Sequence, residues 1–355
     1  SRLAENTLLV PQNARLLVTS AVGDFQCASG SYIVASGLGA SELTDASQTA
    51  ARWSYDRRAV LPSDALYSTG GCTGLGVYTP LSIARSTNDQ ALRLLDGWTD
   101  AEVPDRQTLI ATAAAFSGYS FLLLGEGFCT AAIGGGPEID SQALFDSAEV
   151  RFTRAITEAQ GAGRTDLLNL ARVGRARARL DMGDAAGAAE DAAQVPVDFV
   201  YALDANEVDG RYVNRVYAQN NAGTVTTVAP AYRNLTVQGL PDPRVPVVNE
   251  GTLANDGINP LWRELKYDAL TDDIAVATGV EAQLILAEAR GAGEGVGIIN
   301  ALRARAGVGL PALTADEQAN FTATVFEERR RELWLQGNRW YDIRRGNLPL
   351  VPAAG

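Results

Sequence analysis

The sequence contains no histidine among its 355 residues. Without an imidazole group, Ser-His-Asp and Cys-His catalysis, histidine metal sites and a histidine pH switch are all excluded. Lysine is almost absent as well, because Lys266 is the only one and arginine supplies the other positive charges. The bias toward arginine indicates no particular function.

Excess positive charge is also missing. Thirty Lys and Arg residues face 42 Asp and Glu residues, which gives a net charge of −12 and a pI near 4.6. A nucleic-acid-binding protein needs a basic face, and anionic lipid headgroups attract basic residues. The acidic balance therefore disfavours both kinds of partner. A hydrophobic fraction of 46% with 20% charged residues is that of a folded globular protein.

A long hydrophobic run is lacking too. The longest uncharged stretch, residues 109–125, is short for a membrane span and rich in Ala, Ser, Thr and Gly, so it predicts a buried helix. The chain begins at Ser1 in polar sequence with no signal-peptide pattern, which indicates a mature or trimmed N-terminus. Any attachment to a membrane would depend on an N-terminal lipid carried by residues that this sequence does not include.

Apolar residues at three- and four-residue spacings predict helices over most of the chain. The expected helices cover 14–35, 76–95, 105–127, 141–159, 167–182, 185–193, a pair between 280 and 306, and 314–336 with Gly337 as the C-terminal cap. Ala148, Phe152 and Ala155 repeat the A-x3-F-x2-A pattern of tetratricopeptide repeats. Helical hairpins of this kind bury their apolar faces by stacking on one another.

Residues 199–277 differ from the rest of the chain. They contain Thr-Val-Thr-Thr-Val, several prolines and the turn Asn255-Asp256-Gly257, which predict short strands and long loops. We expect one domain over 1–355, with a helical scaffold at about 10–198 and 278–345 and this irregular region between its two parts. The fold class is mainly α.

The C-terminal sequence E-E-R-R-R-E-L-W-L-Q-G-N-R-W-Y-D-I-R-R, residues 327–345, resembles the signature of the SusD/RagB family, an E-R-x-x-E-L helix followed by G-x-R-W-x-D-L-x-R. Residues 281–307 are similar to the family's "AE…A…IN-x-x-R-x-R-A-G" hairpin. The element Asp242-Pro243-Arg244 resembles a common D-P-R sequence of the family, and residues 24–42 together with Arg57-Arg58 resemble its N-terminal block.

The resemblance implies a helical scaffold of tetratricopeptide-like hairpins that displays loops. It also implies a lipid-anchored protein on the outer membrane of a bacterium, which covers a SusC-like, TonB-dependent transporter and binds glycans or other nutrients without transforming them. The chain is shorter than most members, and the family's N-terminal lipid-bearing cysteine is not in this sequence. We expect the C-terminal motif to be structural: Glu328, Arg331 and Glu332 have spacings suited to ion pairs within a helix, and Trp334, Trp340 and Tyr341 are expected to pack.

The three cysteines, Cys27, Cys72 and Cys129, lack the close spacing of a zinc site. An exported protein favours a disulfide. Cys72 lies just before the expected helix 76–95 and Cys129 just after the helix 105–127, at nearly equal distances from the turn between them. If these helices form an antiparallel hairpin, the two cysteines meet. The sequence therefore predicts a Cys72–Cys129 disulfide, with Cys27 buried and free.

Binding of a sugar combines an aromatic face with polar groups for its hydroxyls. The segment 42–78 offers both in polar loop sequence, where binding residues concentrate. The candidate ligand-binding residues are Glu42, Asp45, Trp53, Tyr55, Arg57, Tyr67 and Tyr78. The alternative is that Trp53 and Tyr55 anchor the loop to the scaffold.

Three functions follow, in order of preference. The first is capture of a nutrient for a TonB-dependent transporter, with no cofactor and no catalysis. The second is a structural or interaction scaffold of the cell surface that lacks a sugar site. The third is a glycan-degrading enzyme, which would need two carboxylates across a cleft rather than adjacent pairs such as Asp272-Asp273.

Overall fold

The computed structural model describes residues 8–61, 63–64 and 69–352, and most of these residues are helical. The helices of the first half are α2 (Ala14–Gly39), α3 (Trp53–Asp56), α5 (Tyr78–Gly97), α6 (Arg106–Gly127), α7 (Ser141–Gly161), α8 (Thr165–Asp181) and α9 (Ala185–Ala192). Those of the second half are α10 (Arg215–Tyr217), α11 (Gly279–Arg290), α12 (Ala292–Ala304), α13 (Ala315–Ala319), α14 (Phe321–Glu332) and α15 (Arg339–Arg345). The mainly α class is confirmed.

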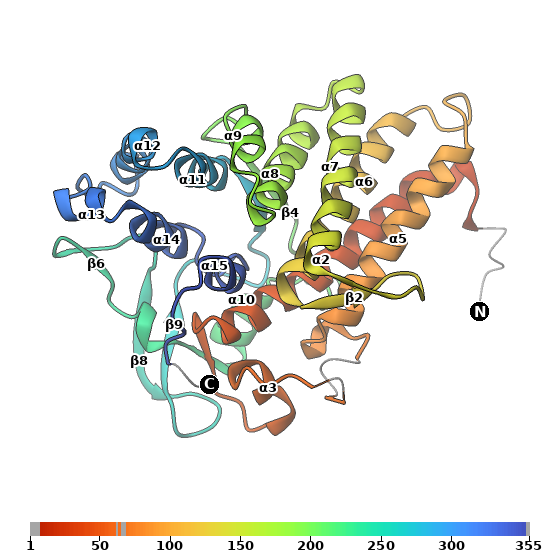
Figure 1. Cartoon of the computed structure of the whole chain (residues 1–355). Coiled ribbons are helices and arrows are strands. Elements are labelled where there is room, and N and C mark those ends of the chain that lie inside the picture. The colour runs from red at the N-terminus through yellow and green to blue at the C-terminus, as the bar shows by residue number, and fades with distance from the viewer. Residues whose placement is uncertain (1–7, 62, 65–68, 353–355) are drawn as a thin grey trace.

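Consecutive helices pack as hairpins, so that α5 contacts α6, α7 contacts α6 and α8, and α9 contacts α8. Asp140 caps α7 by accepting a hydrogen bond from the Ala143 N–H at 2.9 Å. The stack continues from α9 directly to α11. Figure 1 shows this row of helices along the top of the molecule.

Small residues set the spacing of these hairpins. Phe152 of α7 is fully buried, and a Cβ atom placed on Gly118 of α6 or Gly174 of α8 would come within 2.8 Å or 2.4 Å of its ring. One aromatic ring therefore fills the space that two glycines leave on the neighbouring helices. This is the packing that the repeat-like pattern around Phe152 predicts.

The hydrophobic helix α6 lies at the centre of this stack. It is the one described helix that is long and apolar enough to cross a membrane, and 89% of its most apolar window is buried inside the protein. Its burial agrees with the buried helix expected at 109–125.

The irregular region leaves the helical stack and returns to it at one place. Strand β4 (Val200–Leu203) pairs antiparallel with β10 (Ile274–Thr278), which joins the two ends of the region immediately after α9 and before α11. The other pairs are also two-stranded and antiparallel: β1 (Leu43–Asp45) with β5 (Thr226–Val228), β2 (Thr130–Ala132) with β3 (Glu138–Asp140), β6 (Thr236–Val237) with β7 (Leu240–Pro241), and β8 (Val247–Leu253) with β9 (Pro260–Glu264).

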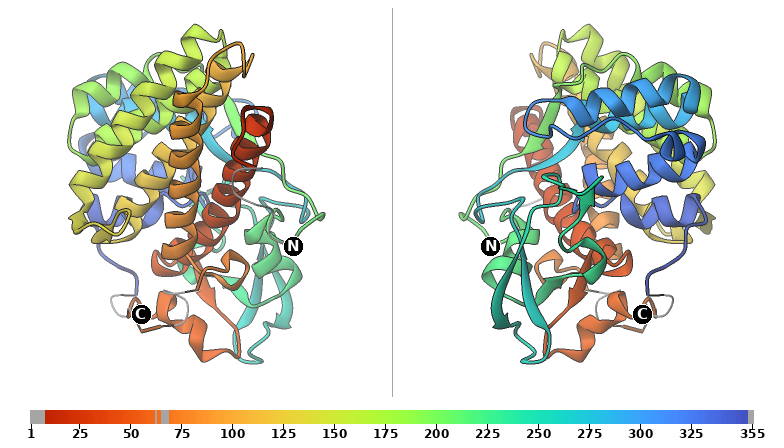
Figure 2. Two further views of the ribbon diagram at one scale, coloured as in Figure 1. Left: turned by 90° about the vertical axis from the view of Figure 1, so that its right-hand side faces the viewer. Right: turned by 90° about the vertical axis from the view of Figure 1, so that its left-hand side faces the viewer.

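This irregular layer is attached to the scaffold through α2 and the C-terminal segment. Ile33 and Leu38 of α2 share a hydrophobic cluster with Val228 of β5, Tyr232 and the fully buried Trp334. In Figures 1 and 2, α3 and the β8–β9 hairpin lie together at the end of the molecule away from the tops of α7 and α8.

The expected helix 314–336 is wrong in its extent. It is two helices, α13 and α14, and α14 ends at Glu332. Thr314 and Glu317 form a capping box that starts α13, while Asn320, with φ −105° and ψ 40°, interrupts the helix. After Glu332 the chain turns through Leu335 and Gly337, both at positive φ, so that Gly337 belongs to this turn and does not cap the helix.

Candidate functional site

Two of the candidate ligand-binding residues are buried. Glu42 is 1% exposed, accepts a hydrogen bond from the Leu335 N–H at 3.2 Å, and has a pKa raised to about 7 because burial penalises its charged form. Asp45 is 8% exposed and accepts hydrogen bonds from the N–H and the hydroxyl of Ser47. Both carboxyl groups therefore hold the chain after α2 and do not face solvent.

Trp53 and Arg57 lie on the surface of α3. The Trp53 indole N–H donates to the Ser47 carbonyl at 3.2 Å, and the Arg57 guanidinium lies over the Trp53 ring, 4.7 Å from its centroid. The anchor to Ser47 fixes the ring, while Arg57 is exposed. The bond from Trp53 to Ser47 is the kind of contact that the anchoring alternative expects of Trp53. Arg57, stacked on the ring, presents a cation at the edge of the irregular layer.

The tyrosines of the segment are placed differently from one another. The Tyr55 hydroxyl donates to the Leu75 carbonyl at 3.2 Å, and burial raises the pKa of Tyr55. Tyr78 packs edge-on against Phe128 at 5.1 Å and accepts a hydrogen bond from the Ala132 N–H. Tyr67 lies outside the described residues.

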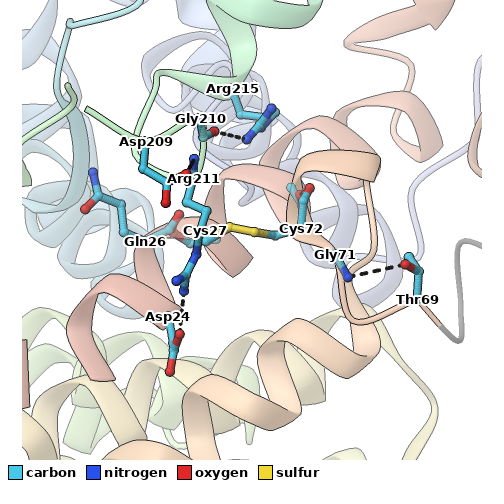
Figure 3. The surroundings of a disulfide bond; sticks show 12 residues. Asp24, Gln26, Cys27, Thr69, Gly71, Cys72, Asp209, Gly210, Arg211 and Arg215 are labelled. Carbon is cyan, nitrogen blue, oxygen red and sulfur yellow. Dashed lines mark hydrogen bonds and ion pairs between the residues drawn. A yellow bond between two sulfur atoms is a disulfide. The ribbon is translucent and has the colours of Figure 1, made fainter. Parts of the chain in front are cut away.

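The expected Cys72–Cys129 disulfide is wrong, because Cys72 is bonded to Cys27 with a Cα–Cα distance of 5.7 Å. The α5–α6 hairpin itself is present, and the contact between Tyr78 and Phe128 shows that its ends meet. Cys72, however, lies six residues before α5, in a short 3-10 turn that packs on the middle of α2 (Figure 3). Cys27 is buried as expected but not free, and Cys129 is the exposed free cysteine.

An aromatic cavity of about 320 Å³ lies between α2, α3, the end of α6 and α15. Its walls are Tyr32, Ala35, Ser36, Gly39, Tyr55, Arg58, Val60, Val77, Gly127, Phe128, Cys129 and Trp340. Four of these residues are aromatic. Of the candidate ligand residues, Tyr55 lines this cavity and Tyr78 supports its wall through Phe128. We define this space as the aromatic cavity.

Arg58 is the charged residue in the wall of the aromatic cavity. Its Nε donates to the Gly39 carbonyl at 2.8 Å, Nη1 to the Pro352 carbonyl at 2.7 Å and Nη2 to the Ser41 hydroxyl at 2.6 Å. These three bonds fix the guanidinium at the rim. The wall contains no carboxylate, and the described part of the chain has no group of three or more potential metal-ligating side chains. The arrangement is suited to hold a ligand with C–H-rich faces against aromatic rings.

Sequence reasoning missed most of this wall. Trp340 was expected to pack the C-terminal motif. Tyr32 gave no sign of a site shared with Phe128 and Cys129, because it precedes them by roughly 100 residues in the sequence. Arg58 follows Arg57 directly, and a positive φ of 54° at Arg58 turns it toward Gly39 and away from α3. The one feature of the sequence that could have pointed to this cavity was Trp340, which follows Arg339 in the C-terminal motif.

The C-terminal motif forms ion pairs, but mostly between elements and not within α14. Glu328 accepts hydrogen bonds from Arg244 and Arg303, and Glu332 accepts from Arg305 and Arg244. Within the helix Arg331 pairs with Glu327, so the expected pairing among Glu328, Arg331 and Glu332 is wrong for the residues that the structure describes. Trp334 is fully buried and Tyr341 packs edge-on against Phe145 at 5.3 Å.

Residues 280–349 match the model of the SusD family. No protein of the curated set matches the sequence. Among solved structures, a SusD-like carbohydrate binding protein from Bacteroides vulgatus superposes with a TM-score of 0.71 at 17% identity, covering 96% of this chain and 84% of that one. A SusD-like carbohydrate binding protein from Bacteroides fragilis gives 0.68 at 15% identity, covering 95% and 86%. A SusD/RagB family protein from Bacteroides thetaiotaomicron gives 0.66 at 11% identity, covering 94% and 86%.

The solved structures show that the chain has the SusD-like fold from α2 to α15. The family match covers the same C-terminal segment that carries the sequence motif. On both grounds, this chain has a SusD-like fold and a C-terminal segment that is similar to the SusD family.

Proposed function

We propose that this protein captures a carbohydrate at the bacterial cell surface, without transforming it, and passes it to a TonB-dependent outer-membrane transporter. The observation that carries the proposal is the aromatic cavity, whose wall combines Tyr32, Tyr55, Phe128 and Trp340 with the fixed guanidinium of Arg58. Pyranose rings stack their C–H faces on such side chains, and a guanidinium donates to ring hydroxyls.

The chemistry of the wall favours binding over hydrolysis. Glycoside hydrolysis requires two carboxyl groups on opposite sides of the scissile bond, and none of the described residues that line this cavity is Asp or Glu. Its volume of about 320 Å³ is at the small end for ligand pockets, which suits one sugar unit of a longer chain. The rest of such a chain would run out toward Trp53 and Arg57 on the adjoining surface of α3.

Relatives support the same proposal, since two solved proteins with this fold are named SusD-like carbohydrate binding proteins. The resemblance to the SusD/RagB family is what supports delivery to a transporter and a place on the outer membrane as parts of this proposal. A lipid on residues outside this sequence would provide the anchor.

Binding is tested by titrating a panel of neutral oligosaccharides into the protein and its variants by calorimetry. Tyr55→Leu and Trp340→Leu remove a ring and are expected to weaken binding by about tenfold or more. Tyr55→Phe keeps the ring and loses only the bond to Leu75, so it is the matched control and should bind within about threefold of the unchanged protein.

The bound sugar is then recovered and its mass measured, since an unchanged mass is expected from a binding protein. Co-purification from detergent-solubilised outer membranes tests the transporter. If the protein without both rings binds the sugar as tightly as the unchanged protein, capture in the aromatic cavity is refuted. Recovery of a cleaved sugar would refute it as well. Isolation of the protein without any TonB-dependent transporter would refute delivery.

A further inference from the structure

Arg339 differs from every neighbouring arginine of the C-terminal motif. Arginines 329, 330, 331, 344 and 345 each donate hydrogen bonds to carboxylates or carbonyl groups. Arg339 has no hydrogen bond or ion pair with any residue that the structure describes, and its Nη1 atom is shielded from solvent. An unpaired guanidinium atom inside a protein costs stability, so a compensating partner is expected from outside the described residues.

The space beside Arg339 can hold such a partner. A cavity of about 310 Å³ lies between α14, α15 and the chain at 348–351. Its walls are Ala40, Ser41, Ala231, Tyr232, Ala323, Phe326, Glu327, Arg330, Arg339, Ile343, Leu348, Pro349 and Val351. We call it the Arg339 cavity. The Arg58 side chain, which donates to both Gly39 and Ser41, lies between this cavity and the aromatic cavity.

A second polar group in the wall also lacks a regular partner. Tyr232 is 2% exposed, and no hydrogen bond of regular geometry reaches its hydroxyl within the described chain. Burial raises the pKa of Tyr232, and the positive charges of the nearby Arg330 and Arg339 guanidiniums oppose this rise. Arg330 itself donates to Glu327 and to the Ala231 carbonyl. The Tyr232 O–H is therefore a buried donor that remains available.

The charges in the wall do not cancel. Among the described residues of the wall, Glu327 is the one carboxylate, and it is shared between Arg330 and Arg331. Glu42 lies behind Arg339, but its pKa of about 7 leaves it only partly charged near neutral pH. The Arg339 cavity thus has a net positive charge in a protein whose total charge is −12.

We propose that the Arg339 cavity binds a small monocarboxylate, whose carboxylate accepts hydrogen bonds from Arg339 and the Tyr232 hydroxyl. Guanidinium–carboxylate bonds are among the strongest in proteins, and the pair would remove both unmet donors. Phe326, Ile343 and Val351 offer apolar contacts to the body of the ligand. Glu327 would repel a second negative charge, which favours a carboxylate over a phosphate monoester. This site goes beyond the proposed function, because it is distinct from the aromatic cavity and recognises an acid.

The first test is ligand binding by the full chain, with matched probes at constant ionic strength. Sodium D-glucuronate and D-glucose differ in the carboxylate alone, and sodium butyrate carries the same group without a sugar ring. Glucuronate or butyrate is expected to raise the melting temperature by roughly 1–2 °C at about ten times its dissociation constant, and glucose is not. Tighter binding of glucuronate than of butyrate identifies the ligand as an acidic sugar. Tighter binding of butyrate identifies it as a simple organic acid.

The variants separate recognition from structure. Arg339→Gln is expected to weaken carboxylate binding by about tenfold or more, Tyr232→Phe by a few-fold, and Arg339→Lys by less than Arg339→Gln. Arg344→Gln is the control, because Arg344 is exposed and donates to the Glu126 carbonyl away from this cavity, so it should bind as the unchanged protein does. The Arg339→Gln protein without ligand should melt no lower than the unchanged protein, since Arg339 makes no hydrogen bond or ion pair with the described residues that the substitution would remove.

Equal shifts from glucuronate, butyrate and glucose would overturn the proposal. So would unaltered carboxylate binding in a folded Arg339→Gln protein, or a marked loss of its melting temperature, which would make Arg339 a structural residue. If neutral oligosaccharides fail to bind while a carboxylate binds through Arg339, the proposed function fails and this inference stands.

Discussion

Arg244 donates from Nη1 to Glu328 Oε2 at 2.6 Å, which joins the Asp242-Pro243-Arg244 loop to α14, 84 residues further along the chain. Arg244 also donates to both carboxylate oxygens of Asp242. These hydrogen bonds favour the charged carboxylate and help to lower the pKa of Asp242 to about 2. Both side chains of the Arg244–Glu328 pair are almost completely buried. The two sequence elements that resemble the family are thus two halves of one ion-pair network.

Breaking this network should be costly. Arg244→Ala leaves Glu328 and Asp242 buried with fewer partners, and we expect the free energy of unfolding to fall by about 3 kcal/mol. Arg263→Ala is the matched control, because Arg263 pairs with Glu250 at the surface and its loss should cost less than about 1 kcal/mol. Urea denaturation of both variants measures the difference. Equal effects would show that the buried pair has no special role.

Helix spacing can be tested at glycine. Gly174→Ala puts a methyl group against the Phe152 ring and should destabilise the protein by roughly 1–3 kcal/mol. Gly97→Ala, at the end of α5 with no atom within 4 Å of the new Cβ, should be neutral or stabilising by up to about 1 kcal/mol. Thermal unfolding distinguishes the two, and a neutral Gly174→Ala would mean that α7 and α8 do not pack through Phe152.

The disulfide gives a prediction in thiol counts. The native protein should react with one equivalent of a thiol reagent, at Cys129, and the reduced, unfolded protein with three. Cys27→Ser should cost about 4 kcal/mol of stability, because the bond closes a loop with a sequence separation of 45 residues. Cys129→Ser should leave stability unchanged. Peptide mapping that links Cys72 to Cys129 would contradict the structure.

The buried carboxyl of Glu42 predicts a pH dependence. Its pKa is about 7 in the folded protein against a usual 4.5, so the folded state keeps a proton that the unfolded state loses. Stability from Glu42 is therefore present below about pH 4.5 and is lost as the pH rises through 7. Glu42→Gln keeps an acceptor for the Leu335 N–H and should abolish this loss of stability, which amounts to about 3 kcal/mol over this range.

Urea denaturation at pH 4.5, 6 and 7.5 measures this difference. Glu264, whose pKa is also raised to about 7 by burial, stays in the variant and leaves a residual slope. Parallel pH profiles for the two proteins would contradict the assignment to Glu42.

Local patterns were sufficient for the helical stack. Apolar spacing located α2 and α5 through α9 to within a few residues, because the outer helices bury one face, α6 is apolar almost throughout, and helix ends are marked by residues such as Asp140 and Gly183. The break at Asn320 was missed, because the helical spacing of apolar residues continues across it. The capping box at Thr314 starts α13 but does not show that this helix ends at Ala319.

The site was harder, for a physical reason. The aromatic cavity is built from α2, α3, α6 and α15, and Arg58, Val60 and Val77, which lie between α3 and α5 in the sequence, complete its wall. The short turn that contains Cys72 lies against α2, where Cys72 bonds to Cys27 and leaves Cys129 free. Loop paths of this kind depend on tertiary contacts such as the bond from the Ser31 hydroxyl to the Cys72 carbonyl, which no local pattern reveals.

Cys129 offers the most direct measurement of whether sugar enters the aromatic cavity, since its free, exposed thiol lies in the wall. The rate of its alkylation by iodoacetamide is measured with and without a saturating amount of an oligosaccharide that binds. If the account is right, the bound sugar slows the reaction by about fivefold or more, and in Tyr55→Leu the same sugar concentration gives little protection. An unchanged rate under saturating sugar would place the ligand elsewhere and contradict the account.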